Sequence, residues 1–189
     1  MSATTLPALI QRFFTDRLCV QMEASRHTVA GYRDTFRLLL RYASTQRVKP
    51  PVKLMVEDID ADLVADFLAH TETARGNSAR SRNTRLAAIR SFFRYVAMAD
   101  PTWLMHCQRI LAMPNKRYVR RTVTFLDAAE IAALLAAPDR TTWAGRRDHA
   151  LLLLAVQTGL RASELVGLTL GDVVLGSGAH VRCTGKGRK

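Results

Sequence analysis

The sequence is poor in cysteine and lacks a long apolar run. Its three cysteines, Cys19, Cys107 and Cys183, lie far apart and form no CxxC or CxxxxH spacing, so no zinc site is expected. We interpret them as reduced, mostly buried thiols of a cytoplasmic protein. The longest apolar run, residues 150–156, is far too short to cross a bilayer. The first residues show no basic stretch followed by a long apolar segment, so no signal peptide is expected.

Acidic residues are also scarce. The chain of 189 residues carries 28 Lys and Arg against 16 Asp and Glu, and 23 of the basic residues are arginine. The planar arginine fork suits bidentate phosphate contacts, so this balance favours nucleic acid or an anionic membrane surface as partner. Composition alone leaves equally open that the arginines only solubilise the surface. The 48% hydrophobic content excludes global disorder.

Apolar residues at helical spacing predict four helices in the first half of the chain. The first covers about residues 6–22, and the second follows a Ser25 cap. The third begins near Asp60, and the fourth lies between the turn at residues 76–78 and the stop at residues 100–101. Four amphipathic helices with short connections indicate a small helical bundle.

A change in pattern divides the chain. Residues 114–124 are basic and have no apolar period, which predicts a linker between a helical domain, 1–113, and a second region, 125–189.

The second region is predicted to contain both helices and strands. Asp127 is placed to cap a helix, and the nearly continuous apolar residues of 147–157 predict a helix buried on most sides. Short strands are predicted at residues 173–175 and 180–183, joined by a glycine-rich turn.

The most basic stretch spans the fourth helix and the linker. Residues 74–126 contain eleven Lys or Arg and one acid, Asp100. A solvated helix face normally carries both positive and negative side chains, whereas a face with charges of one sign is best tolerated where it contacts phosphates. A plain solvated face is the alternative. The candidate DNA contacts, with Asn83 and Thr84 as possible base readers, are Arg80, Arg82, Asn83, Thr84, Arg85, Arg90, Lys116, Arg117, Arg120 and Arg121.

Two further cations stand in distinctive local settings. Gly159 permits a tight turn that places Arg161 at a helix start, and Glu164 lies on the same face, where it can hold the guanidinium. Such a pair could grip a phosphate, or it could be a simple salt bridge at a helix cap. Lys186 lies between two glycines at a predicted hairpin tip, where it could donate a proton or be a generic basic turn.

The run of residues 158–173, with Arg161, Glu164 and Asp172, and the turn around Lys186 resemble the tyrosine recombinases of the phage integrase family. The resemblance implies a mainly α chain. An N-terminal four-helix SAM-like core-binding domain is followed by the first part of an α+β catalytic domain with a short β-hairpin.

The resemblance also implies an activity, site-specific DNA recombination and integration of a mobile element. In this family a tyrosine attacks the scissile phosphate, and no metal or other cofactor is used. Arg161 and Lys186 take the catalytic roles of the first arginine and the lysine, with Glu164 in support. The complete enzyme is expected to act as a homo-oligomer, a tetramer, on double-stranded DNA.

The family's His-x-x-Arg box and tyrosine nucleophile correspond to positions beyond Lys189. We therefore expect the chain as given to bind DNA in the cytoplasm, without a membrane, and not to cleave it. One alternative is a non-catalytic module that occupies recombination sites or pairs with a full-length recombinase. Another is a helical adaptor whose charge is incidental.

Overall fold

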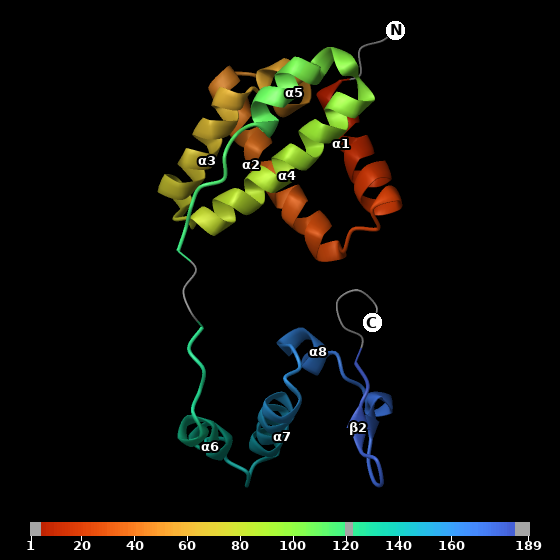
Figure 1. The fold of residues 1–189 in the computed structure, drawn as a ribbon, viewed down its shortest axis with the longest axis vertical. Helices are drawn as coiled ribbons and strands as arrows, with labels where there is room; N and C mark the ends of the chain where they lie inside the picture. Colours follow the sequence, from red (N-terminus) through yellow and green to blue (C-terminus); the bar gives the residue numbers. More distant parts are fainter. Residues whose placement is uncertain (1–4, 120–122, 184–189) are drawn as a thin grey trace. The chain divides into compact units, whose positions relative to one another are not determined.

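The computed structural model describes residues 5–119 and 123–183 and divides into two compact units, residues 1–120 and 121–189 (Figure 1). The division falls within the stretch predicted as a linker, residues 114–124. Each unit is described by itself.

The first unit is a bundle of helices, and the prediction of a mainly α chain is confirmed. Its elements in chain order are α1 (Leu6–Arg12), η1 (Phe13–Gln21), α2 (Arg26–Arg47), η2 (Pro51–Lys53), η3 (Val56–Asp58), α3 (Ala61–Arg75), α4 (Ala79–Ala99), η4 (Pro101–Trp103) and α5 (Leu104–Leu111). The first predicted helix is therefore continuous in sequence, but its second half, η1, has π-helical geometry.

Local polar chemistry explains where these helices begin and end. The side chains of Ser25, Asp60 and Ser78 each accept a backbone N–H three residues ahead, which caps α2, α3 and α4. Gly76 ends α3 in the left-handed conformation, with φ of 61°.

The short helix α5 was missing from the predicted four-helix bundle. It has eight residues, of which only Cys107 and Ile110 are buried. Two buried positions give too short an apolar stripe to distinguish a helix from a loop in the sequence.

An aromatic cluster forms the centre of the first unit. The ring of Phe92 on α4 lies 5.4 Å from that of Phe13 on η1 and 5.1 Å from that of Phe36 on α2. All three side chains are almost fully buried. Because these rings come from three elements, the cluster fixes α4 against the first two helical segments.

The second unit contains short helices and one hairpin. Its elements are α6 (Ala128–Ala136), α7 (Trp143–Thr158), α8 (Ala162–Val166), η5 (Leu170–Asp172), β1 (Val173–Val174) and β2 (His180–Val181). The strands pair antiparallel, with Val173 opposite Val181, as the sequence predicted for this part of the chain. Asp127 caps α6, its carboxylate accepting the Glu130 backbone N–H.

Two expectations about burial were wrong. Helix α7 is not buried on most sides, since Leu151 is 37% and Val156 40% exposed. The helices and hairpin described in this unit are too few to cover all its faces. The cysteines are not mostly buried either: Cys107 is, whereas Cys19 and Cys183 are exposed.

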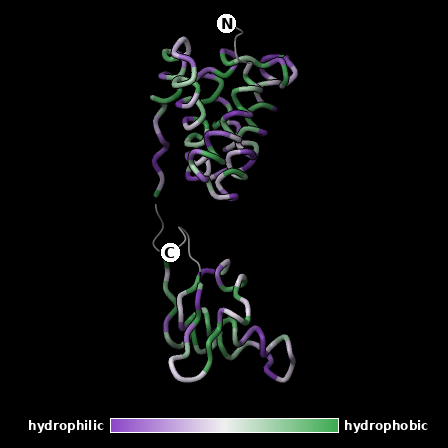
Figure 2. The backbone as a smooth tube through the Cα atoms, turned by 90° about the vertical axis from the view of Figure 1, so that its right-hand side faces the viewer, coloured by the Kyte–Doolittle hydropathy of each residue, from purple (hydrophilic) through white to green (hydrophobic). Residues whose placement is uncertain are grey.

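Hydrophilic and hydrophobic residues alternate along the helices of both units (Figure 2). Within residues 5–119 and 123–183, no helix combines the length and apolarity needed to cross a membrane.

The aromatic cluster yields a stability test. We expect Phe92→Ala to lower the free energy of unfolding of the first unit by about 3–5 kcal/mol, because it leaves a cavity between three elements. Met98→Ala, on the same helix but 73% exposed, should change it by no more than about 0.5 kcal/mol. The reporter is alkylation of Cys107, because burial raises the pKa of its thiol to about 11 and keeps it unreactive while the unit stays folded.

Alkylation of Cys107 should therefore accelerate strongly in Phe92→Ala. The exposed Cys19 should react at the same rate in both variants and in the unchanged chain. An unchanged rate at Cys107 in Phe92→Ala would show that the cluster does not hold this unit together.

Candidate nucleic-acid interface

The candidate contacts gather on α4 and on the extended segment that follows α5. Arg80, Arg82, Asn83, Thr84, Arg85 and Arg90 belong to α4, and Lys116 and Arg117 belong to the segment. Arg120 and Arg121 lie outside the described residues.

Two of the α4 arginines are held by acids on neighbouring helices. Arg82 Nε lies 3.7 Å from Glu72 Oε2 on α3, and Arg85 Nη1 lies 3.0 Å from Asp34 Oδ2 on α2. Their side chains are only 16% and 15% exposed. Hydrogen bonds from Arg37 and Arg85 lower the pKa of Asp34, so this acid stays ionised.

Sequence reasoning missed these two acids. Asp34 and Glu72 both precede the basic stretch of residues 74–126, and Asp34 is 51 residues from its partner. Helical spacing relates residues that are three or four positions apart, so it could not indicate that Asp34 meets Arg85 or that Glu72 meets Arg82.

Several buried donors on the same surface remain without a protein partner. Among the described residues, four buried side-chain nitrogens have no hydrogen bond: Asn77 Nδ2, Arg82 Nη1, Arg85 Nε and Arg90 Nε. All lie on α4 or in the turn just before it. A buried unsatisfied donor costs about 1–3 kcal/mol. These four nitrogens are shielded from solvent, so a ligand at the surface would have to bind other N–H groups of this region.

Arg90 is perturbed by its surroundings. Burial lowers the pKa of Arg90, and the guanidinium groups of Arg94 and Arg82 lower it further. Two other cations therefore lie near enough to Arg90 to repel its charge.

The remaining candidates differ in exposure and in whether their side chains have partners within the protein. Arg80 and Arg117 are exposed, and no ion pair involves either within the described part of the chain. Thr84 Oγ1 donates to the Arg80 carbonyl at 3.0 Å. Asn83, expected to read a base, instead has both its amide oxygen and nitrogen bonded to the Lys116 backbone.

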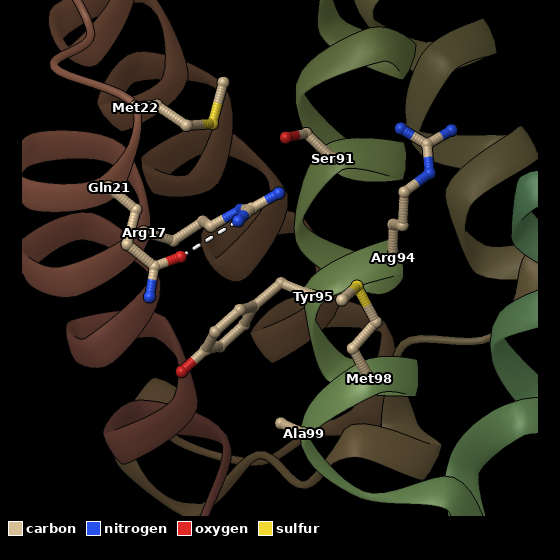
Figure 3. Close-up of a pocket in the computed structure, with 8 residues that line it drawn as sticks. All are labelled: Arg17, Gln21, Met22, Ser91, Arg94, Tyr95, Met98 and Ala99. Atoms are coloured by element: carbon tan, nitrogen blue, oxygen red, sulfur yellow. Dashed lines mark hydrogen bonds between the residues drawn. The ribbon is translucent and has the colours of Figure 1, made fainter.

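A pocket of about 280 Å³ lies between η1 and the C-terminal half of α4. In Figure 3, Arg17 hydrogen-bonds Gln21 and points toward Ser91, whereas the Arg94 side chain is directed away from Arg17. The two cations of this pocket therefore do not converge on a single anion position.

The second unit places Arg161 as the sequence predicted, at the start of a helix. Gly159 ends α7 with φ of 65°, and Arg161 directly precedes α8. Glu164 Oε2 accepts the Arg161 backbone N–H at 2.9 Å, and Glu164 Oε1 accepts Arg161 Nη1 at 2.7 Å. The Arg161 side chain is 70% exposed, so other N–H groups of its fork face solvent.

The hydrogen bonds from Arg161, first through its backbone and then through its guanidinium, lower the pKa of Glu164. The carboxylate is thus a fixed anion that orients the arginine. Lys186, the other predicted catalytic cation, lies outside the described residues.

Comparison with known proteins identifies the family. The family model of the phage integrase N-terminal SAM-like domain matches residues 10–99, and that of the phage integrase family matches residues 124–189. The chain belongs to the phage integrase family. The first match of this integrase-family chain includes α4, and the second includes Arg161 and Glu164.

Named relatives agree. The chain is 55% identical to a Sinorhizobium fredii protein provisionally named integrase/recombinase y4rC, over 98% of this chain and 56% of that protein. It is 42% identical to y4rD of the same organism, over 97% of this chain and 66% of that protein. It is 35% identical to the tyrosine recombinase XerC of Rhodospirillum centenum, over 88% of this chain and 48% of that protein. The chain thus spans between about half and two thirds of these relatives.

The Arg161–Glu164 pair yields a pH test. We expect Arg161→Ala to raise the pKa of Glu164 part of the way toward its ordinary value of 4.5, because the guanidinium is lost while the backbone N–H remains. The folded-state pKa is lowered, so the stability that this carboxylate contributes is complete above pH 4.5 and is lost as pH falls through the folded-state value. An NMR titration of the Glu164 carboxyl carbon measures the shift.

Asp172 is the matched control. Its pKa is lowered mainly by hydrogen bonds from Thr169, so it should titrate alike in both chains. A Glu164 titration that is the same with and without Arg161 would mean that the pair does not form in solution.

Proposed function

We propose that α4 and the segment of residues 115–117 bind double-stranded DNA through its phosphates. The observation that carries this proposal is the set of cations that α4 and the segment bring together, of which Arg80 and Arg117 are exposed and have no ion pair within the described residues. Phosphate oxygens would accept hydrogen bonds from these two guanidinium groups. Arg82 and Arg85, held by Glu72 and Asp34, would add positive charge on the same helix.

We propose further that the protein takes part in site-specific DNA recombination, in keeping with relatives that are named integrase/recombinase and tyrosine recombinase. In that reaction Arg161 would hold the non-bridging oxygens of the scissile phosphate with the N–H groups that Glu164 does not engage. Glu164 would keep the guanidinium oriented, and Lys186 would donate the proton to the leaving oxygen. We propose a homo-oligomer on DNA, a tetramer in the complete enzyme, and a cytoplasmic location.

A second candidate function is DNA binding without cleavage. It concerns these 189 residues alone, in which Tyr32, Tyr42 and Tyr95 pack against the core of the first unit. Tyr118, the fourth tyrosine, lies in the segment after α5. All four therefore precede the unit that carries Arg161.

Salt dependence tests the proposed binding. We expect affinity for a duplex of about 30 base pairs to fall steeply with salt, and Arg80→Ala to make the slope of log K against log salt shallower by about 0.9, the value of one phosphate contact. Fluorescence anisotropy of labelled DNA measures both. Lys53→Ala removes an exposed cation in η2, beyond the C-terminal end of α2, and should leave the slope unchanged.

Binding that is absent at low salt, or that does not weaken as salt rises, would rule out a phosphate-binding surface. Equal slopes for Arg80→Ala and the unchanged chain would place the surface away from α4.

A covalent-adduct assay separates the two candidate functions. We expect the chain of 189 residues to give no complex with duplex DNA that survives SDS, because its tyrosines are used in packing or lie outside the Arg161 unit. A labelled band that survives SDS and disappears on protease treatment would assign the chain a nucleophile of its own.

A further inference from the structure

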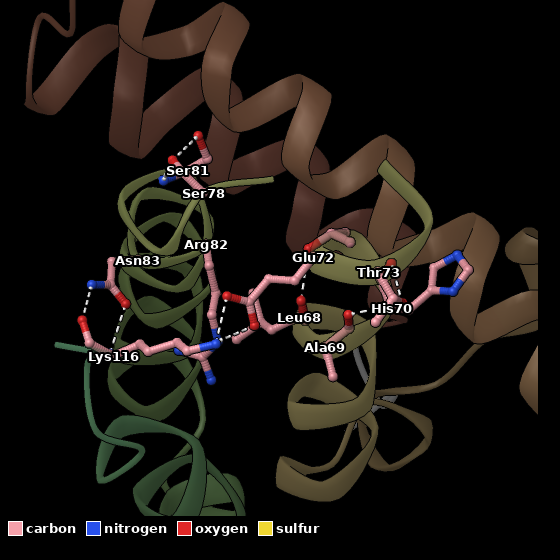
Figure 4. A network of polar contacts seen from close by, with 11 residues as sticks. Leu68, Ala69, His70, Glu72, Thr73, Ser78, Ser81, Arg82, Asn83 and Lys116 are labelled. Atoms are coloured by element: carbon pink, nitrogen blue, oxygen red, sulfur yellow. Dashed lines mark hydrogen bonds and ion pairs between the residues drawn. The ribbon is translucent and has the colours of Figure 1, made fainter. Parts of the chain in front are cut away.

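A clasp of five side chains holds the segment after α5 against α4. Asn83 and Arg90 lie on α4, Glu72 lies on α3, and Asn115 and Lys116 lie in the segment itself (Figure 4 shows Asn83, Glu72 and Lys116). We use the word clasp for this set of contacts, which joins residues up to 44 positions apart in the sequence.

Asn83 is the central part of the clasp. Its Nδ2 donates to the Lys116 carbonyl at 2.8 Å, and its Oδ1 accepts the Lys116 backbone N–H at 2.9 Å. An amide side chain carries its donor and its acceptor on two separate atoms in one plane, so it satisfies both backbone groups of one residue as a neighbouring strand would. This pairing fixes the peptide and not just the side chain of Lys116.

One further contact sets the direction of the segment. Arg90 Nη1 donates to Asn115 Oδ1 at 3.1 Å, so residue 115 lies beside residue 90 while residue 116 lies beside residue 83. The segment therefore runs antiparallel to α4. Arg117 is the next residue of the segment, and on the helix Arg80 lies about one turn before Asn83.

Glu72 completes the arrangement. Its Oε1 binds Lys116 Nζ at 2.8 Å, and its Oε2 lies 3.7 Å from Arg82 Nε. A single carboxylate thus holds one cation from the helix and one from the segment close together, in spite of their mutual repulsion.

We propose that Asn83 is a positioning residue, which fixes Lys116 and Arg117 on the α4 surface before DNA arrives. Helix and segment then present one continuous row of cations to the phosphates. This inference rests on the proposed DNA binding. A residue already ordered does not lose its backbone freedom on binding, so the clasp raises affinity without adding a phosphate contact.

The test is a double-mutant cycle on DNA affinity in the full chain. Asn83→Ala should weaken binding roughly tenfold, the order of the cost of fixing one residue, and leave the salt slope unchanged. In a chain that already carries Lys116→Ala and Arg117→Ala, the same change should have almost no effect, because the clasp then has no cations to place. Ser91→Ala, also on α4, is the control and should bind as the unchanged chain does.

Amide hydrogen exchange checks the clasp directly. Exchange in residues 115–117 should accelerate in Asn83→Ala and not in Ser91→Ala, while the core of α4 stays protected in both. Loss of protection throughout α4 would instead show that Asn83 supports the helix itself, and would overturn the inference.

Two binding results would also overturn it. If the unchanged chain binds with a steep salt dependence and Asn83→Ala binds equally well, DNA binding stands and the positioning role fails. If Asn83→Ala is equally weakened with and without Lys116 and Arg117, Asn83 acts by another route. Absence of binding by the unchanged chain would contradict the proposed function, and this inference with it.

Discussion

The packing of α4 into the aromatic cluster is the constraint on which the first unit depends. Phe92 contacts Phe13 and Phe36, and this burial fixes the rotation of the helix about its axis. Once one face is committed to the core, the arginines of α4 must share the rest of the surface with one another. Their crowding follows from the burial of Phe92 and its neighbours. The pKa of Arg90 is lowered first by its own burial and then by the nearby guanidinium groups of Arg94 and Arg82.

Acids on the neighbouring helices neutralise only part of this positive charge. Asp34 and Glu72 each take one α4 arginine, and Glu72 also takes Lys116. Partly buried ion pairs of this kind gain little net stability, because desolvation offsets most of the attraction. They do keep the guanidinium groups in fixed positions. The surface is thus ordered while the exposed Arg80 and Arg117 have no ion pair within the described residues, which is the state expected of a preorganised anion-binding surface.

The arginine of the second unit is organised by a different principle. Arg161 and Glu164 are three residues apart and meet through the geometry of a helix start, with Gly159 supplying the turn before it. No distant element is needed for this pair. The α4 surface, in contrast, depends on contacts between α2, α3, α4 and the segment after α5.

The sequence by itself determined what is local: the Ser25, Asp60 and Ser78 caps, the course of the predicted helices, the hairpin, and the Arg161–Glu164 pair. Helical period, capping and turn chemistry act over a few residues, so they can be read directly from the order of residues. Only the tertiary structure decided that Arg85 meets Asp34, that Asn83 binds the Lys116 backbone 33 residues away, and that α7 is partly exposed. An apolar stripe shows which face of a helix is buried but not which element covers it, because that choice depends on the packing of the whole unit.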